Sequence, residues 1–164
     1  MKNLSLVLFS LLFVACAQTK TPPTTVETTP TTEQEAQLVP IEKASVVKFF
    51  DYACGHCRTA HFTAKNLKTE FGDKIEFELK HFPLSPATYL VAETAECARR
   101  QDKFEAYHDK LFEENFQNYE VDNLQTVAES VGIDMEQFNT CVANGGGRSA
   151  VQADVDEATA LGVS

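Results

Sequence analysis

Hydrophobic and polar positions divide this chain into three regions. Leu4–Ala15 is an uncharged apolar run behind Lys2, too short for a bilayer-spanning helix of about 20 residues. Thr19–Ala36 carries eight threonines and three prolines without apolar periodicity, which is typical of an unpacked tether. From Ile41 onward, apolar residues recur at spacings typical of strands and helices. We therefore expect the folded domain to span residues 41–164.

The predicted domain begins with two strands that flank a helix. Ser45–Asp51 is apolar and rich in β-branched residues, which predicts a buried strand. Ile75–His81 alternates between apolar and polar side chains, which predicts a second strand with one buried face. Between them, apolar spacing predicts a helix over Cys54–Phe71 that stops at Gly72.

Helices are predicted for the rest of the chain. Pro83 and Pro86 interrupt it after the second strand. The expected helices are Ala87–Arg100, Lys103–Asn118, Asp122–Val131, Asp134–Ala143 and Ser149–Leu161. We expect Asp122 to be the N-cap of its helix, and Gly132 and Gly162 to end theirs.

Length and charge narrow the class of protein. The 164 residues suit one domain, and 43% hydrophobic residues are ordinary for a globular protein with a core. The net charge of −10 argues against nucleic-acid binding, which needs a basic surface.

The apolar run near the N-terminus predicts an export signal. Its end, Phe13–Cys16, resembles a bacterial lipobox, in which the signal is cut before a cysteine that becomes lipidated. We expect a signal peptide at residues 1–15, and a lipidated Cys16 followed by a tether that ends at residue 40. More than one acyl chain would then hold the protein firmly on a membrane. Plain secretion with cleavage nearby and an uncleaved anchor are the alternatives.

The clearest chemical motif is Cys54–Gly55–His56–Cys57, which follows a predicted strand and opens a predicted helix. Cysteines three apart on a first helical turn lie on one side, close enough to form a disulfide. The N–H groups of that turn have no partner within the helix, and they favour a thiolate at the first sulfur. We expect Cys54 to be the exposed sulfur that exchanges disulfides and Cys57 the buried resolving one. A protonated His56 is expected to stabilise the thiolate further.

Other interpretations of the motif are weaker. A structural zinc site usually needs four ligands, and Cys54, Cys57 and His61 supply three. Haem attachment needs a histidine directly after the second cysteine, where Arg58 stands. An inert local disulfide is the remaining alternative.

Four separated segments resemble, in order, DsbA-like thiol–disulfide oxidoreductases of the thioredoxin superfamily. They are Val46–Cys57 (VVKFFDYACGHC), Lys80–Leu84, Gln101–His108 and Ala158–Val163. The resemblance covers residues 41–164. It implies an α/β, thioredoxin-like fold with an inserted helical subdomain at residues 87–161.

The resemblance also implies disulfide exchange with exported proteins. The expected partners are unfolded or reduced exported proteins and a membrane thiol reoxidase or reductase, with no bound cofactor and a monomeric chain. The Gly–His pair between the cysteines is similar to that of protein disulfide isomerases. Family members continue into a cis-proline loop, a β-hairpin and a last helix. No proline follows Pro86, so we expect this sequence to be C-terminally truncated.

Two further cysteines, Cys97 and Cys141, lie on predicted helices. Relatives sometimes carry cysteines at both places, and exported proteins meet oxidising conditions. We therefore expect a structural disulfide between them, and two buried thiols are the alternative.

The other polar residues are expected to be structural or solvated. His61 is predicted on the surface of its helix, and His81 and His108 are interpreted as structural. The acidic clusters Glu113–Glu114 and Asp154–Glu157 are predicted to be solvated faces.

Together these patterns predict an extracytoplasmic thiol–disulfide oxidoreductase, tethered by lipid to the bacterial cell envelope and acting as an oxidase. A reductase or isomerase is the alternative within the class. A non-catalytic lipoprotein, either a metal-binding chaperone or an envelope adaptor, is the alternative from another class.

Overall fold

The structure is a computed structural model that describes residues 43–114 and 119–164. All of them belong to one structural unit, Val39–Ser164. The predicted signal peptide, Cys16 and the predicted tether lie outside the described residues. So do positions 115–118.

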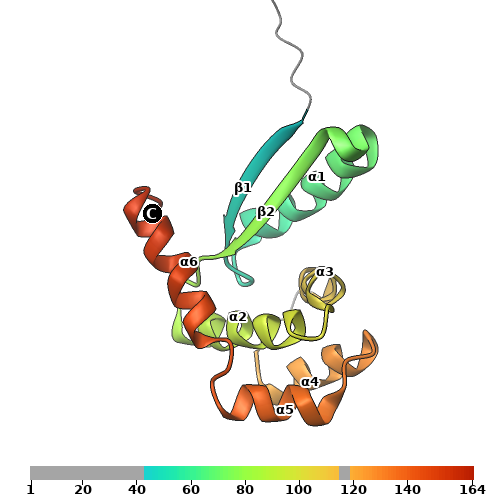
Figure 1. The fold of residues 1–164 in the computed structure, drawn as a ribbon, viewed down its shortest axis with the longest axis vertical. Coiled ribbons are helices and arrows are strands. Elements are labelled where there is room, and N and C mark those ends of the chain that lie inside the picture. Colours follow the sequence, from blue (N-terminus) through green and yellow to red (C-terminus); the bar gives the residue numbers. More distant parts are fainter. Residues whose placement is uncertain (1–42, 115–118) are drawn as a thin grey trace, which may run out of the picture. The chain divides into compact units, whose positions relative to one another are not determined.

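The unit begins with a strand–helix–strand arrangement (Figure 1). Strands β1 (Ala44–Phe50) and β2 (Ile75–His81) pair in parallel, in a register that joins Ala44 to Ile75 and Phe50 to His81. Helix α1 (Gly55–Phe71) and a short 3-10 turn, Gly72–Lys74, connect them, and α1 lies along the strand pair. Because the strands are parallel, the loops that follow both of them meet at one end of the sheet.

Five helices follow the second strand. They are α2 (Pro86–Arg99), α3 (Phe104–Glu114), α4 (Val121–Ser130), α5 (Met135–Ala143) and α6 (Arg148–Ala160). Figure 1 shows α2 crossing the carboxyl ends of the strands, with α6 rising beside β2. The predicted order of strand, helix, strand and helical block is therefore confirmed, with most boundaries shifted by one residue.

Two local predictions are wrong. The third helix after β2 begins at Val121, so its N-cap is Glu120 rather than Asp122, and no side chain caps it. The first strand is not buried along its length, since Val46 is 38% and Val47 is 45% exposed. Within the described chain β1 pairs with β2 alone, so one of its edges is uncovered.

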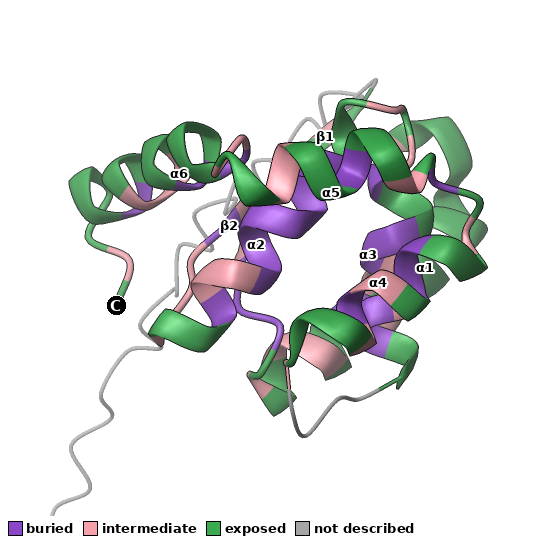
Figure 2. Cartoon of the chain, turned by 90° about the horizontal axis from the view of Figure 1, so that it is seen from below, coloured by how far each residue is buried: buried purple, intermediate pink, exposed green. Residues whose placement is uncertain are grey.

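Helix α2 is the centre of the helical part. Every residue of 91–98 is buried, so α2 has packing partners on several sides (Figure 2). Helix α6 approaches it closely at Gly147, where an added Cβ would lie 2.2 Å from the carbonyl oxygen of Glu93. Cys97 of α2 forms a disulfide with Cys141 of α5, with 5.8 Å between their Cα atoms.

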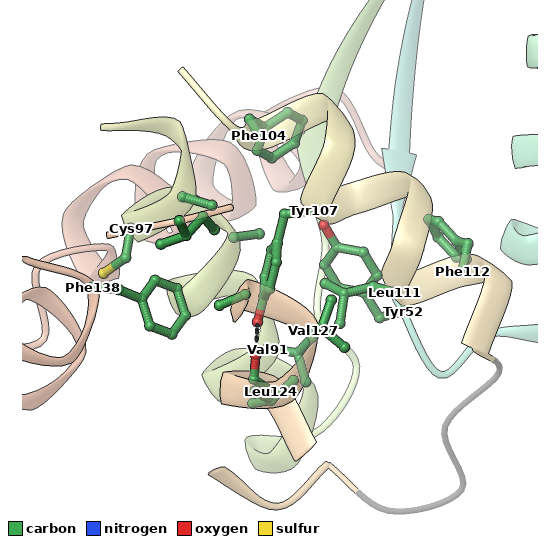
Figure 3. Close-up of a cluster of buried hydrophobic side chains, with 14 of the residues drawn as sticks. Tyr52, Val91, Cys97, Phe104, Tyr107, Leu111, Phe112, Leu124, Val127 and Phe138 are labelled. Carbon is green, nitrogen blue, oxygen red and sulfur yellow. Dashed lines mark hydrogen bonds between the residues drawn. The ribbon is translucent and has the colours of Figure 1, made fainter. Parts of the chain in front are cut away.

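Tyr107 lies in the middle of the core (Figure 3). It is fully buried, and its hydroxyl lies 3.2 Å from the Thr94 hydroxyl and 3.1 Å from the carbonyl oxygen of Leu124. Its contacts join α2, α3 and α4. This helical block faces the loops at the carboxyl ends of the strands (Figure 1).

Candidate functional site

The two cysteines of the motif lie where β1 turns into α1. Cys54 is the N-cap of α1, and its Sγ accepts a hydrogen bond from the backbone N–H of Cys57 at 3.4 Å. The Cys54 N–H in turn donates to the carbonyl oxygen of Asp51 at 3.2 Å. Both cysteines are reduced and partly exposed. The first helical turn therefore aims its unpaired N–H groups at the Cys54 sulfur.

The pKa values of the two thiols are shifted in opposite directions. A hydrogen bond from the Cys57 side chain is the main cause that lowers the pKa of Cys54, and the backbone N–H groups of Cys57 and His56 lower it further. Burial is the main cause that raises the pKa of Cys57. Cys54 is therefore the thiol that ionises first, which suits a nucleophile and a good leaving group.

The His56 side chain is exposed at the start of α1. Its backbone N–H is one of the groups that lower the pKa of the Cys54 thiol. The sequence motif places this N–H correctly because any residue at this position of the first turn presents one.

An aromatic cluster packs around Tyr52, two residues before Cys54. Tyr52 is buried, and its hydroxyl lies 3.0 Å from Nδ1 of His108. Burial raises the pKa of Tyr52 and lowers the pKa of His108 well below its usual value, so the hydrogen bond joins a neutral phenol to a neutral imidazole. Phe50 and Phe112 pack edge-on against the same imidazole, with ring centroids 4.7 Å and 5.0 Å away.

His61 was expected on the surface of its helix, and this prediction is wrong. The residue is only 3% exposed, and its ring stacks on Phe112 with centroids 4.8 Å apart. Helix α3 packs against that side of α1, so the position one turn after Cys57 is covered. Burial lowers the pKa of His61, although the nearby Asp109 carboxylate raises it.

The sequence interpretation gave no role to two cations of this region, Arg58 and Lys48. Arg58 donates from Nε to the carbonyl oxygen of Phe112 at 2.7 Å, which ties α1 to the end of α3. Lys48 lies over the rings of Phe50 and Phe112, with Nζ 5.4 Å and 5.7 Å from their centroids. Burial lowers the pKa of Lys48, while Cys57 and Asp109 raise it.

His81 and the second acidic cluster meet at the end of β2. His81 is fully buried, and its Nε2 lies 2.9 Å from Oε1 of Glu96. Its backbone N–H donates to the Asp154 carboxylate at 2.8 Å, and Lys80 donates to Glu157 at 2.7 Å. The prediction of a solvated face at Asp154–Glu157 is therefore wrong in part, because these carboxylates fasten α6 to β2.

The structure thus brings Cys54, His56 and Cys57 together and places Cys97 and Cys141 in a separate disulfide. Within residues 43–114 and 119–164, no group of three metal-ligating side chains is gathered. In the same part of the chain, no helix is both long and apolar enough to cross a membrane.

The strand–helix–strand unit, its helical insertion and the cysteine pair at a helix N-terminus define a thioredoxin-like fold of the DsbA type. A family model described as Thioredoxin matches residues 41–164, and the chain belongs to that family. The predicted family and fold class are confirmed.

Solved structures agree with this fold. A thioredoxin-like oxidoreductase from Silicibacter pomeroyi DSS-3 is 27% identical with a TM-score of 0.65, and the match covers 75% of this chain and 70% of that one. The thiol-disulfide exchange protein alpha-DsbA2 from Wolbachia pipientis is 22% identical with a TM-score of 0.65, covering 73% and 65% of the two chains.

The curated relatives are longer proteins. The chain is 31% identical over 123 residues to the Na(+)/H(+) antiporter NhaA 1 of Salinispora arenicola, which covers 73% of this chain and 19% of that protein. It is 28% identical over 123 residues to NhaA 3 of Salinispora tropica, again 73% and 19%. The chain thus spans about a fifth of these relatives. Antiport activity belongs to those longer proteins, and this chain matches only a small part of each.

Proposed function

We propose that this protein exchanges disulfides with other proteins through Cys54 and Cys57, acting as an oxidase. The observation that carries the proposal is that the pKa values of the two thiols are shifted in opposite directions. Cys54 lies at the N-terminus of α1, with its pKa lowered by hydrogen bonds, while burial raises the pKa of Cys57. The family membership and the oxidoreductase among the similar structures support it.

The reaction begins with the Cys54–Cys57 disulfide and a substrate that carries two thiols. A substrate thiolate attacks Sγ of Cys54, the bond to Cys57 breaks, and Cys57 leaves as a thiolate that takes up a proton. The second substrate thiolate then attacks the substrate sulfur of the mixed disulfide and expels Cys54. Two electrons pass from the substrate dithiol to the cysteine pair. The lowered pKa of Cys54 makes it the better leaving group in the second step.

The pKa shift also favours the oxidising direction. A stabilised Cys54 thiolate stabilises the reduced pair, so the disulfide form gives up its bond more readily. The chain's own residues supply the nucleophile, the leaving group and the N–H groups that hold it, so the exchange needs no bound cofactor. A membrane thiol oxidant is the co-reactant that restores the disulfide.

The purified full chain tests this proposal with a reduced, unfolded protein as substrate and glutathione disulfide as oxidant. We expect the rate of disulfide formation to fall to the uncatalysed rate in Cys54→Ser. Cys57→Ser is expected to accumulate a mixed disulfide through Cys54, which intact-mass measurement detects. Cys16→Ser is the matched cysteine control and should keep the wild-type rate. A wild-type protein without activity, or an active Cys54→Ser variant, would refute the proposal.

The place of action is a further part of the proposal. We propose export through residues 1–15, a lipid anchor on Cys16, a tether over residues 16–40 and a monomeric domain at the bacterial cell envelope. The apolar run that ends at Ala15 and the Thr/Pro-rich stretch behind it support this arrangement. Metabolic labelling with a fatty acid should mark the wild-type chain and not Cys16→Ser. Equal labelling of both would remove the anchor from the proposal.

A further inference from the structure

Asp51 is a buried acid directly beside the cysteine pair. It follows the last residue of β1, three positions before Cys54, and is only 4% exposed. Its main-chain oxygen accepts from the Cys54 N–H at 3.2 Å, and a hydrogen bond from its backbone favours the Cys57 thiolate. The backbone of Asp51 therefore reaches both residues of the pair.

The carboxylate of Asp51 joins two loops. Oδ1 accepts from the Ala53 N–H at 2.5 Å, within the turn that leads to Cys54. Oδ2 accepts from the Leu84 N–H at 2.6 Å, in the loop that follows β2. One side chain thus fixes the turn before the redox pair against the neighbouring loop, whose Leu84 side chain is 67% exposed.

The negative charge of this carboxylate is held by backbone N–H groups. No lysine, arginine or histidine of the described chain forms an ion pair with Asp51. A buried charge without a counter-charge acts strongly on other charges nearby, because little solvent screens it. The nearest groups that change charge in the proposed reaction are the two thiols.

We propose that Asp51 is a positioning residue of the thiol–disulfide site, which fixes the Cys54 turn against the Leu84 loop and opposes negative charge on the cysteine pair. This inference rests on the proposed function and deepens it. The N–H groups of the first turn of α1 favour the thiolate, and Asp51 counters them. The oxidising strength of the pair is then set by the balance of the two.

The electrostatics support this assignment. The Asp51 charge raises the pKa of both thiols, against the hydrogen bonds that lower the pKa of Cys54. Removing the charge should therefore stabilise the Cys54 thiolate and with it the reduced pair. The cysteine pair would become a stronger oxidant.

The test is the titration of Cys54 in the full chain, followed by the ultraviolet absorbance of the thiolate in reduced protein. Asp51→Asn removes the charge and keeps one acceptor oxygen. We expect the pKa of Cys54 to fall by about half a unit, roughly a threefold gain in thiolate below the pKa. The equilibrium with glutathione should shift toward the reduced pair by a similar factor. If Asp51→Asn does not fold, Asp51→Ser, with a smaller neutral acceptor, carries the same test.

Two controls separate charge from packing. Asp73→Asn removes an exposed acid from the turn before β2 and should leave the pKa of Cys54 unchanged. Asp51→Glu keeps the charge, so the pKa should stay closer to that of the wild type than in Asp51→Asn, even if stability falls. A Cys54 pKa that is unchanged or raised in Asp51→Asn would overturn the proposal and leave Asp51 with a structural role alone. The titration needs no turnover, so an inactive wild type would remove the proposed function without preventing this test.

Discussion

Loss of the disulfide between α2 and α5 should lower the free energy of unfolding substantially. Cys97 and Cys141 are 44 positions apart, so their bond closes a long loop in the unfolded chain. The chain-entropy model gives about 4 kcal/mol of stabilisation for a loop of this length at 25 °C. For a folded part of this size, that corresponds to a fall in Tm of roughly 15 °C.

The measurement is urea unfolding of the full chain without reductant, followed by far-ultraviolet circular dichroism. The double variant Cys97→Ala/Cys141→Ala should unfold at a much lower urea concentration than the wild type. The double variant Cys54→Ala/Cys57→Ala is the matched control. This control removes two cysteines that are three positions apart and reduced in the structure, so its free energy of unfolding should change little.

Two results would refute this reasoning. The first is a free energy of unfolding that falls by less than about 1 kcal/mol in the Cys97/Cys141 variant relative to its control, because closing a loop of this length should contribute more. The second is thiol labelling of both Cys97 and Cys141 in Cys54→Ala/Cys57→Ala after denaturation without reductant, which would show that these two cysteines are not bonded.

Three further predictions concern the surroundings of the site. The pKa of His108 is lowered in the folded protein, so below about pH 6.5 the unfolded chain binds more protons than the folded one. The contribution of His108 to the free energy of unfolding should therefore be fully present above about pH 6.5 and be lost as the pH falls below it. In denaturant titrations at several pH values, His108→Gln should flatten this dependence, and an unchanged pH dependence would contradict the assignment. Arg58→Ala should cost about 1–2 kcal/mol in urea unfolding, since its guanidinium donates to carbonyls at the end of α3; an unchanged midpoint would contradict this. Gly147→Ala should lower the thermal midpoint by several degrees, because its Cβ would overlap the Glu93 backbone, and a wild-type midpoint would show that α6 can move away freely.

The sequence predicted the order of elements because their signals are local. Alternation over Ile75–His81 gave a strand with the bounds seen in the structure. The redox motif was placed correctly at a helix N-terminus, since two cysteines three apart after an apolar strand have a clear local geometry. Asp134 was expected to start its helix and caps it through a hydrogen bond to the Gln137 N–H.

The failures involve contacts between elements that are distant in sequence. The burial of His61 depends on α3, which lies more than forty positions away. The exposure of Val46 depends on which elements cover the faces of the strand pair, and a β-branched run looks the same whether or not a face is covered. Asp51 carries a weak signal, an acid directly after an apolar strand, but the loop that it holds is identified only by the fold.

The Cys97–Cys141 disulfide has a consequence for the biogenesis of the protein. Cys97 is only 1% exposed, so its sulfur is inaccessible once α2 and α5 have packed. The bond must therefore form during folding, while both thiols can still be reached by an oxidant. Each newly made copy is then a substrate for the same chemistry that we propose for the mature protein.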